Sequence, residues 1–354
     1  MFRSLALASG AIALICIATA DLSAAKDKKP AAAQKDLQLV WPLPPEQPRI
    51  KYLRTYQSAN DFKAAKKPSR FAALLLGPQD PGAGGDALLK PYGVAASKSG
   101  KVYVADTAAK RAFVFDPDKK DVSFLGEDGA GRLAKPIGVA VDADGTVFVA
   151  DATLKRVFGY DPDGRMRVAI GHEGELENPS GLALDRVNHR LYVADSGKHQ
   201  VLVYSSLDGA AQQTLGARGT DDAQFNFPTN LTVDRQGQLY VADTLNFRVQ
   251  VFDPKGQFVR TFGTLGDGPG QMNRPKGVGV DSEGHVYVVD ASFNNFQIFD
   301  DAGQLLLFVG SGGRNPGEFI LPAGMSVDEQ DRLYVADQGN SRVQVFQYLN
   351  GATR

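Results

Sequence analysis

A short motif that ends in aspartate recurs six times along this 354-residue chain and constrains its fold more than any other feature. Each copy reads Val-Ala-Asp, or Val-Val-Asp in the fifth, and successive copies lie 44 to 48 residues apart. A proline recurs in step upstream, and glycine follows it by two residues in every repeat except the fourth, which has Asn230. Such self-similarity indicates one supersecondary unit repeated along the chain. The motifs end at Asp106, Asp151, Asp195, Asp243, Asp290 and Asp337.

Each repeat contains four short segments in which β-branched and aromatic residues alternate with polar ones. In the fourth repeat these segments cover residues 231–233, 238–241, 248–252 and 257–262, and polar turns rich in Asp and Gly separate them. This alternation, bounded by turn residues, is typical of antiparallel strands joined by hairpins. Six units of four strands predict an all-β protein: a six-bladed β-propeller of four-stranded antiparallel blades.

The sixth repeat contains only three strands, the last over residues 342–346. The segment over residues 50–56 resembles a fourth strand, because its sequence is similar to that of residues 258–262. We therefore predict that an N-terminal strand completes the sixth blade and closes the ring, which removes open sheet edges without a disulfide. The expected propeller covers residues 49–349: a closing strand over 49–56, an insertion over 57–88 with a short helix at Arg70 to Leu76, and the repeats over 89–349.

The repeat is similar to the NHL repeat. The pattern Pro-x-Gly-Val-x-Val-Asp, then Val-Tyr-Val-Ala-Asp, then Asn-x-Arg-Val-Gln-Val-Phe carries this resemblance over residues 89–349, and Asn246/Arg248 and Asn340/Arg342 match it best. The Trp41-Pro-Leu-Pro-Pro lead-in also resembles that of exported bacterial NHL propellers. No RING, B-box or coiled-coil segment precedes the repeats, so the ubiquitin-ligase members of the wider family are a poor guide to function.

The N-terminal segment has the features of an export signal. Arg3 precedes an apolar run over residues 5–17, and small residues ending at Ala20 and Ala25 provide two cleavage sites. We expect residues 1–25 to be a signal peptide, residues 26–48 to be a linker and Pro-rich lead-in, and the mature protein to be periplasmic or secreted. Cys16, the only cysteine, leaves the alternative of a lipoprotein anchored at that residue, although the bulky Ile15 before it fits a lipidation signal poorly.

The six aspartates are expected to be structural. An arginine follows five residues later in four repeats, an offset that spans one tight turn, so an Asp–Arg pair or an Asp-to-backbone hydrogen bond is expected at each site. A ring of carboxylates that binds Ca²⁺ is the less favoured interpretation. The arginines are Arg111, Arg156, Arg248 and Arg342.

No set of residues for catalysis or metal binding emerges from the sequence. The four histidines share no equivalent inner position, and no carboxylate stands at the inner-strand entrances, so we expect no metal and no cofactor. A binding protein is favoured over an enzyme. The alternative, a metal-dependent propeller lyase or lactonase-like hydrolase with its site in the central channel, rests on fold analogy. The entrance residues are Tyr92, Ile137, Ser180, Thr229, Asn230, Lys276 and Ala323.

The loops before the first strands and between the second and third strands share one face of a propeller, and here they carry basic and aromatic residues. Such a face can bind an acidic envelope protein, a peptide or a glycan, although it can equally be a solvated surface. The formal net charge of −1 and the expected export argue against nucleic acid, and we expect a monomer that meets the membrane only if Cys16 is lipidated. The candidate binding residues are Tyr92, Lys110, Lys155, Lys198, Phe247, Lys276 and Phe293, with His199, Arg274 and Arg314 on the same face.

Overall fold

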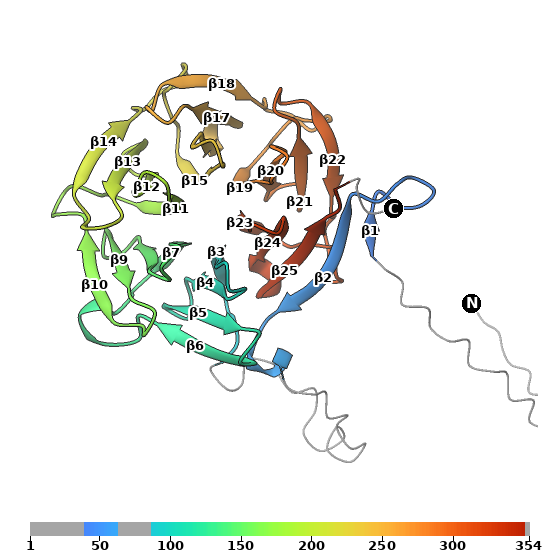
Figure 1. Ribbon diagram of the computed structural model, residues 1–354. Helices are drawn as coiled ribbons and strands as arrows, with labels where there is room; N and C mark the ends of the chain where they lie inside the picture. Colours follow the sequence, from blue (N-terminus) through green and yellow to red (C-terminus); the bar gives the residue numbers. More distant parts are fainter. Residues whose placement is uncertain (1–38, 63–85, 351–354) are drawn as a thin grey trace, which may run out of the picture. The chain divides into compact units, whose positions relative to one another are not determined.

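The computed structural model describes residues 39–62 and 86–350, which form six antiparallel sheets arranged around a central channel (Figure 1). The first blade consists of β3 (Pro91–Ala96), β4 (Val102–Asp106), β5 (Arg111–Asp116) and β6 (Asp121–Leu125). The second consists of β7 (Pro136–Val141), β8 (Val147–Asp151), β9 (Arg156–Tyr160) and β10 (Met166–Ile170). The third consists of β11 (Pro179–Asp185), β12 (Arg190–Asp195), β13 (Gln200–Ser205) and β14 (Ala211–Leu215). The fourth consists of β15 (Pro228–Val233), β16 (Leu239–Asp243), β17 (Arg248–Phe252) and β18 (Phe258–Phe262). The fifth contains β19 (Pro275–Val280), β20 (Val286–Asp290), β21 (Asn295–Phe299) and β22 (Leu305–Val309). The predicted all-β, six-bladed propeller is confirmed.

The sixth blade is assembled from both ends of the described chain. Its inner strands are β23 (Pro322–Val327), β24 (Arg332–Asp337) and β25 (Arg342–Tyr348), and β2 (Ile50–Tyr56) pairs with β25 in antiparallel register from Ile50↔Tyr348 to Tyr56↔Val343. Closure of the ring by an N-terminal strand is therefore confirmed, and Figure 1 shows β2 in blue beside the red C-terminal strand.

A fifth strand, which the sequence did not suggest, extends this blade outward. The two-residue β1 (Val40–Trp41) pairs with the start of β2, and the Trp41 ring lies 5.8 Å from the Phe346 ring in an edge-on contact. The Arg49 N–H also donates to the Trp41 carbonyl at 2.7 Å. Part of the Pro-rich lead-in thus packs on the propeller.

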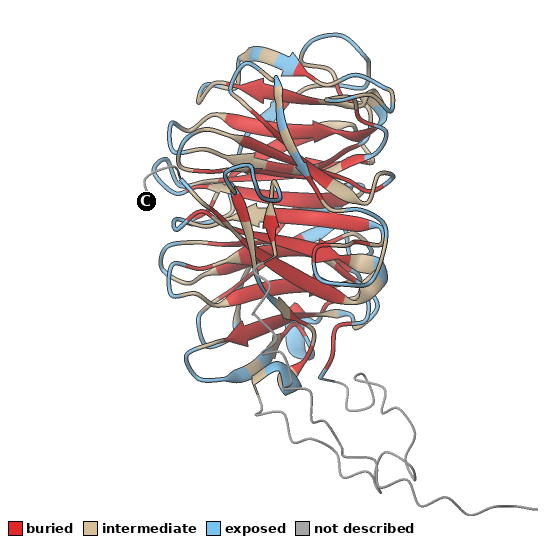
Figure 2. Cartoon of the chain, turned by 90° about the vertical axis from the view of Figure 1, so that its right-hand side faces the viewer, coloured by how far each residue is buried: buried red, intermediate tan, exposed pale blue. Residues whose placement is uncertain are grey.

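The core lies between neighbouring blades, because each sheet buries both of its faces. Figure 2 shows buried residues concentrated in the strands and exposed residues in the loops on two opposite sides. At the junction where the ring closes, Tyr56 of β2 and Tyr334 of the sixth blade pack in one cluster with Phe113 and Phe115 of the first blade. The closing strand thus contributes to the core as well as to the hydrogen-bonded ladder.

The recurring glycine permits the inner strands to approach one another. A Cβ atom on Gly138 would lie 2.0 Å from the Ser180 carbonyl oxygen of the next blade, and one on Gly324 would lie 2.4 Å from the Tyr92 carbonyl oxygen. Neither strand can move away without opening the blade interface, so a side chain is not tolerated there. The Pro-x-Gly pattern therefore marks the wall of the channel.

Four short 3₁₀ helices complete the described elements: η1 (Ala59–Phe62), η2 (Gly129–Gly131), η3 (Thr244–Asn246) and η4 (Gln338–Asn340). In the expected insertion, η1 follows β2 directly, and Ser58 and Ala87 form an isolated bridge. The helix expected at residues 70–76, the signal at 1–25 and most of the linker lie outside the described residues. Within the described ranges, no helix has the length and apolar character needed to span a membrane.

Candidate functional site

Six buried aspartates hold together the two sets of loops on one face of the propeller. In the first blade, Asp106 is completely buried and accepts hydrogen bonds from the N–H groups of Leu89 and Lys90, which precede the first strand, at 2.7 and 2.9 Å. It also accepts from Ala108 and Ala109 in the turn between the second and third strands, at 3.0 and 2.9 Å. In each of the other five blades, the recurring aspartate likewise accepts a hydrogen bond from a backbone N–H of the loop before the first strand. The recurring aspartate thus fixes both sets of loops, which together are called the loop face below.

The expected Asp–Arg pair forms in the fourth and sixth blades. Arg248 Nε donates to Asp243 at 2.9 Å, and Arg342 Nε donates to Asp337 at 2.7 Å. Burial raises the pKa of the Asp243 carboxyl, and the hydrogen bonds from Asn226, Asn246 and Arg248 oppose that rise.

The other two arginines at this offset, Arg111 and Arg156, make different contacts from those of Arg248 and Arg342. Arg111 donates to Glu127 at 2.5 Å, and its guanidinium carbon lies 3.9 Å from the centre of the Phe124 ring. Arg156 is exposed and makes no ion pair with any of the residues that the structure describes. Asp151 instead makes the alternative contact that was expected, hydrogen bonds from the backbone of its turn. The five-residue offset alone is therefore insufficient to produce the pair.

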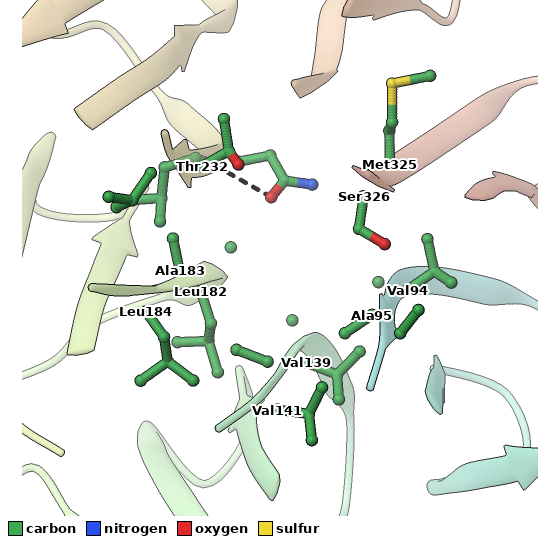
Figure 3. Close-up of a pocket in the computed structure, with 18 of the residues that line it drawn as sticks. Val94, Ala95, Val139, Val141, Leu182, Ala183, Leu184, Thr232, Met325 and Ser326 are labelled. Carbon is green, nitrogen blue, oxygen red and sulfur yellow. Dashed lines mark hydrogen bonds between the residues drawn. The ribbon is translucent and has the colours of Figure 1, made fainter. Parts of the chain in front are cut away.

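The central channel is lined by apolar side chains together with polar groups. Its lining side chains come from the inner strands of several blades, and Figure 3 shows Val94, Val139, Leu182, Met325 and Ser326 around a common space. The cavity has a volume of about 120 Å³. Among residues 39–62 and 86–350, no group of three or more His, Cys, Asp or Glu side chains is placed to hold a metal ion.

At the end of the channel where the first strands begin, Lys276 of the fifth blade reaches Tyr92 of the first. The Lys276 ammonium lies 4.9 Å from the centre of the Tyr92 ring, a cation–π geometry. Burial and the charges of Arg274 and Lys90 lower the pKa of Lys276 to about 8. Burial also raises the pKa of Tyr92 to about 12, against the opposing charge of Arg274. These four residues are called the mouth cluster below.

The other expected binding residues lie on the loop face in turns farther along each blade. Lys110, Lys155 and Phe247 occupy the same position, the last residue before the third strand, and all three have a left-handed backbone with φ of 54° to 57°. The two lysines are exposed, whereas Phe247 and Phe293 are partly buried. Lys198 is already engaged, because its ammonium donates to the carbonyls of Gly174 and Glu175 at 2.6 and 2.8 Å.

Lys90 is the member of the mouth cluster that the sequence did not suggest. It stands immediately before the recurring proline, the same position that Arg274 holds in the fifth blade. Comparing this position across repeats could have found it. The convergence with Lys276 depends on the ring, in which the sixth blade stands between the fifth and the first and presents only Ala323 at the equivalent inner position.

Comparisons with known proteins agree with the fold. The family model for the NHL repeat matches residues 176–204, 225–252, 272–299 and 319–346, which lie in the third to sixth blades. NHL repeat-containing protein 2 of Bos taurus is 35% identical over 94 residues, which is 24% of this chain and 13% of the relative. The chain thus spans only a small part of the length of this relative.

Solved structures similar to this chain include both an enzyme and a binding protein. A streptogramin B lyase matches with a TM-score of 0.57 and 12% identity, over 74% of this chain and 94% of the lyase. An auxiliary nutrient binding protein from Bacteroides thetaiotaomicron matches with a TM-score of 0.58 and 16% identity, over 75% of this chain and 71% of that protein. At these identities the likeness shows the shared fold alone.

Proposed function

Because the chain is an NHL-repeat protein built on a six-bladed propeller, we propose that it is exported to the cell envelope and acts there as a binding scaffold. The partner we favour is a protein that presents an acidic segment to the loop face. The observation that supports this most is the construction of that face, where each blade fixes two loops with a buried aspartate.

The rigidity of the loop face supports recognition of a partner. Loops fixed by buried carboxylates lose little conformational freedom when a partner binds, so less of the binding free energy is spent on ordering them. Lys110 and Lys155 are exposed at turns whose backbone is defined, which places two positive charges at fixed points on the rim of the face. Positive charges of this kind favour association with an acidic surface, most strongly at low salt.

Affinity capture from envelope extracts tests the proposal. We expect the tagged chain to retain a partner that the double variant Lys110→Glu/Lys155→Glu loses. A matched control, Lys119→Glu/Lys255→Glu, changes two exposed lysines in the turns between third and fourth strands, at the opposite end of the blades. The proposal is wrong if both double variants retain the same proteins as the unchanged chain.

Export is tested separately by the mass of the protein recovered from the envelope. Removal of residues 1–25 would leave a mature chain that begins at Lys26. Lipidation would instead leave Cys16 at the N-terminus with the added mass of the lipid. An intact N-terminus in a cytoplasmic fraction would overturn the export proposal.

The alternative function is that of a metal-dependent enzyme. Among the described residues, no group of side chains placed to hold a metal ion supports it. Metal analysis of the purified protein decides between the two functions, because stoichiometric Zn²⁺ or Ca²⁺ would favour the enzyme. The scaffold proposal expects no metal that purifies with the chain in that ratio.

A further inference from the structure

Three cationic residues stand at the starts of the inner strands of the first and fifth blades, Lys90 and Arg274 immediately before the proline and Lys276 immediately after it. None of the ion pairs among the described residues includes Lys90, Arg274 or Lys276. Lys276 is nevertheless partly buried, and the charges of Lys90 and Arg274 both act on it. Lys90 and Arg274 are exposed, so the cost in the unliganded protein falls on Lys276, whose ammonium form is disfavoured by its burial and by the two like charges.

The neighbours of Lys276 fix the position of its charge. The ammonium stands against the face of Tyr92, and Ala323 of the intervening blade is fully buried with a side chain too short to separate the two. Tyr92 and Lys276 each follow the recurring proline of their inner strand by one residue, so both sit at the rim of the channel. The positive charge is therefore held where a ligand on the loop face can reach it.

We propose that the mouth cluster binds one anionic group, a carboxylate or a phosphate, with Lys276 and Arg274 as its principal partners and Lys90 as a supporting charge. The inference rests on the proposed function, since the anion would be the part of the partner that lies at the centre of the loop face. An anion at this point supplies the opposite charge that the three cations lack, and charge-assisted hydrogen bonds to it are stronger than neutral ones.

The dimensions of the channel limit what can bind. The cavity of about 120 Å³ is smaller than the roughly 300 to 1,000 Å³ of pockets that enclose a whole drug-sized ligand. Its wall combines aliphatic side chains such as Val94 and Val139 with polar ones such as Asn230 and Ser326. Because the cavity is small, a single carboxylate or phosphate fits better than an extended anionic cofactor.

Binding should be coupled to protonation of Lys276. The pKa of Lys276 is about 8 in the unliganded protein, and a bound anion raises it because the anion favours the ammonium form. Near pH 8 the complex therefore takes up a proton, whereas at pH 6 the ammonium is already formed and uptake is small. The affinity for the anion should fall as the pH rises through 8 and beyond.

Isothermal titration calorimetry of the full chain tests this directly, with inorganic phosphate, succinate and a hexaglutamate peptide as separate probes at low ionic strength. We expect at least one probe to bind at one site per chain. Its affinity should be at least tenfold weaker for Lys276→Met and for Arg274→Gln than for the unchanged chain. Titrations at pH 8 in buffers of different ionisation enthalpy should show proton uptake that Lys276→Met abolishes.

Lys255→Met is the matched control, because it removes an exposed lysine in the turn between β17 and β18, in the neighbouring fourth blade and at the end opposite the loop face. It should bind the probe like the unchanged chain. The melting temperature of Lys276→Met should be equal to or above that of the unchanged chain, since the substitution removes a repelled charge, and this separates loss of binding from loss of folding.

The three probes distinguish the source of the anion. Binding of succinate and hexaglutamate but not phosphate indicates a carboxylate ligand, and the reverse indicates a phosphate ligand. The proposed anion site is wrong if none of the three probes binds, or if Lys276→Met and Arg274→Gln both bind the probe with unchanged affinity. The scaffold proposal would then still be decided by affinity capture. If affinity capture retains no partner but an anion binds at one site per chain, the scaffold proposal is contradicted. The mouth cluster is then a site for a small anion.

Discussion

The second and sixth blades share four antiparallel strands, to which β1 adds a fifth in the sixth blade, but they are stabilised by different contacts. In the sixth, Asp337 accepts hydrogen bonds from the side chains of Asn340, Arg342 and Gln344 as well as from the Ile320 N–H. In the second, the residues at the positions of the Asn and Gln are Leu154 and Phe158, and Asp151 accepts hydrogen bonds only from backbone N–H groups. The family model matches the sixth blade and not the second.

The polar network around the aspartate is therefore not what specifies the blade. Both blades share the buried aspartate and the glycine that permits close approach of inner strands. The network adds a connection to the incoming loop, because Arg342 donates to the carbonyls of Arg314, Asn315 and Glu318 at 2.7 to 2.9 Å. A second difference is covalent: the second blade is one continuous segment, whereas the sixth depends on β2.

Deletion of residues 49–56 should have the largest effect, because it removes the fourth strand of the sixth blade. The deletion exposes the edge of β25 and takes Ile50 and Tyr56, both buried, out of the core clusters on either side of the blade. We expect an aggregated or unfolded protein by size-exclusion chromatography and circular dichroism. Substitution of the exposed Leu53 and Arg54 by Ser, which retains the strand, is the control. A soluble deletion variant with an unchanged melting temperature would show that the ring closes without β2.

Asp337→Ala should have the next largest effect. It leaves the buried guanidinium of Arg342, whose side chain is 7% exposed, without its charge partner, and it leaves the Ile320 N–H without an acceptor. Loss of one member of a buried pair costs about 3–5 kcal/mol. Chemical denaturation measures the change in the free energy of unfolding. Asp337→Asn removes the charge but retains an acceptor and should lose less than Asp337→Ala, so equal losses would show that the charge of Asp337, rather than its hydrogen bonds, carries the stabilisation.

The features of the fold that could be predicted from the sequence are those in which all repeats share one physical requirement. The period of the Pro-x-Gly and Ala-Asp motifs predicted six blades, and the similarity of residues 50–56 to a fourth strand predicted closure. β1 was missed because two residues beside prolines show no alternation, and its pairing depends on the contact between Trp41 and Phe346.

The arginines show where prediction from spacing fails. The five-residue offset predicted an Asp–Arg pair or an Asp-to-backbone hydrogen bond, but it did not decide between them. Arg156 lacks the Asn and Gln that surround Arg248 and Arg342 in their blades and remains exposed, and Asp151 makes the backbone hydrogen bonds alone. The mouth cluster was only partly predicted, because Lys90 and Lys276 are far apart in the sequence. The charge of Lys90 acts on Lys276 because the ring places the first and fifth blades on either side of the sixth.

Asp151→Ala should destabilise the protein less than Asp337→Ala. The substitution removes the acceptor for Ala134, Lys135, Thr153 and Leu154, whose N–H groups lie 2.6 to 3.0 Å from the carboxylate, but it strands no buried cation. Each polar group left unsatisfied costs about 1–3 kcal/mol, and water that enters at the loop face reduces that cost by accepting from these N–H groups. The same denaturation experiment, performed beside Asp337→Ala, measures the difference. A loss as large as that of Asp337→Ala would show that the backbone hydrogen bonds, rather than the arginine, carry most of the stabilisation.

Arg156→Ala should have the smallest effect. Its guanidinium is exposed and has no ion pair within residues 39–62 and 86–350, so removal should change the free energy of unfolding by no more than about 0.5 kcal/mol. Arg342→Ala occupies the equivalent position in the sixth blade and should cost several times more, because it leaves Asp337 buried and three loop carbonyls without a donor. If the two arginine variants lose equal stability, the difference between the blades lies in the closing strand. If only Arg342→Ala is destabilised, the Asp–Asn–Arg–Gln network accounts for the difference, and the blades that lack it depend on apolar packing.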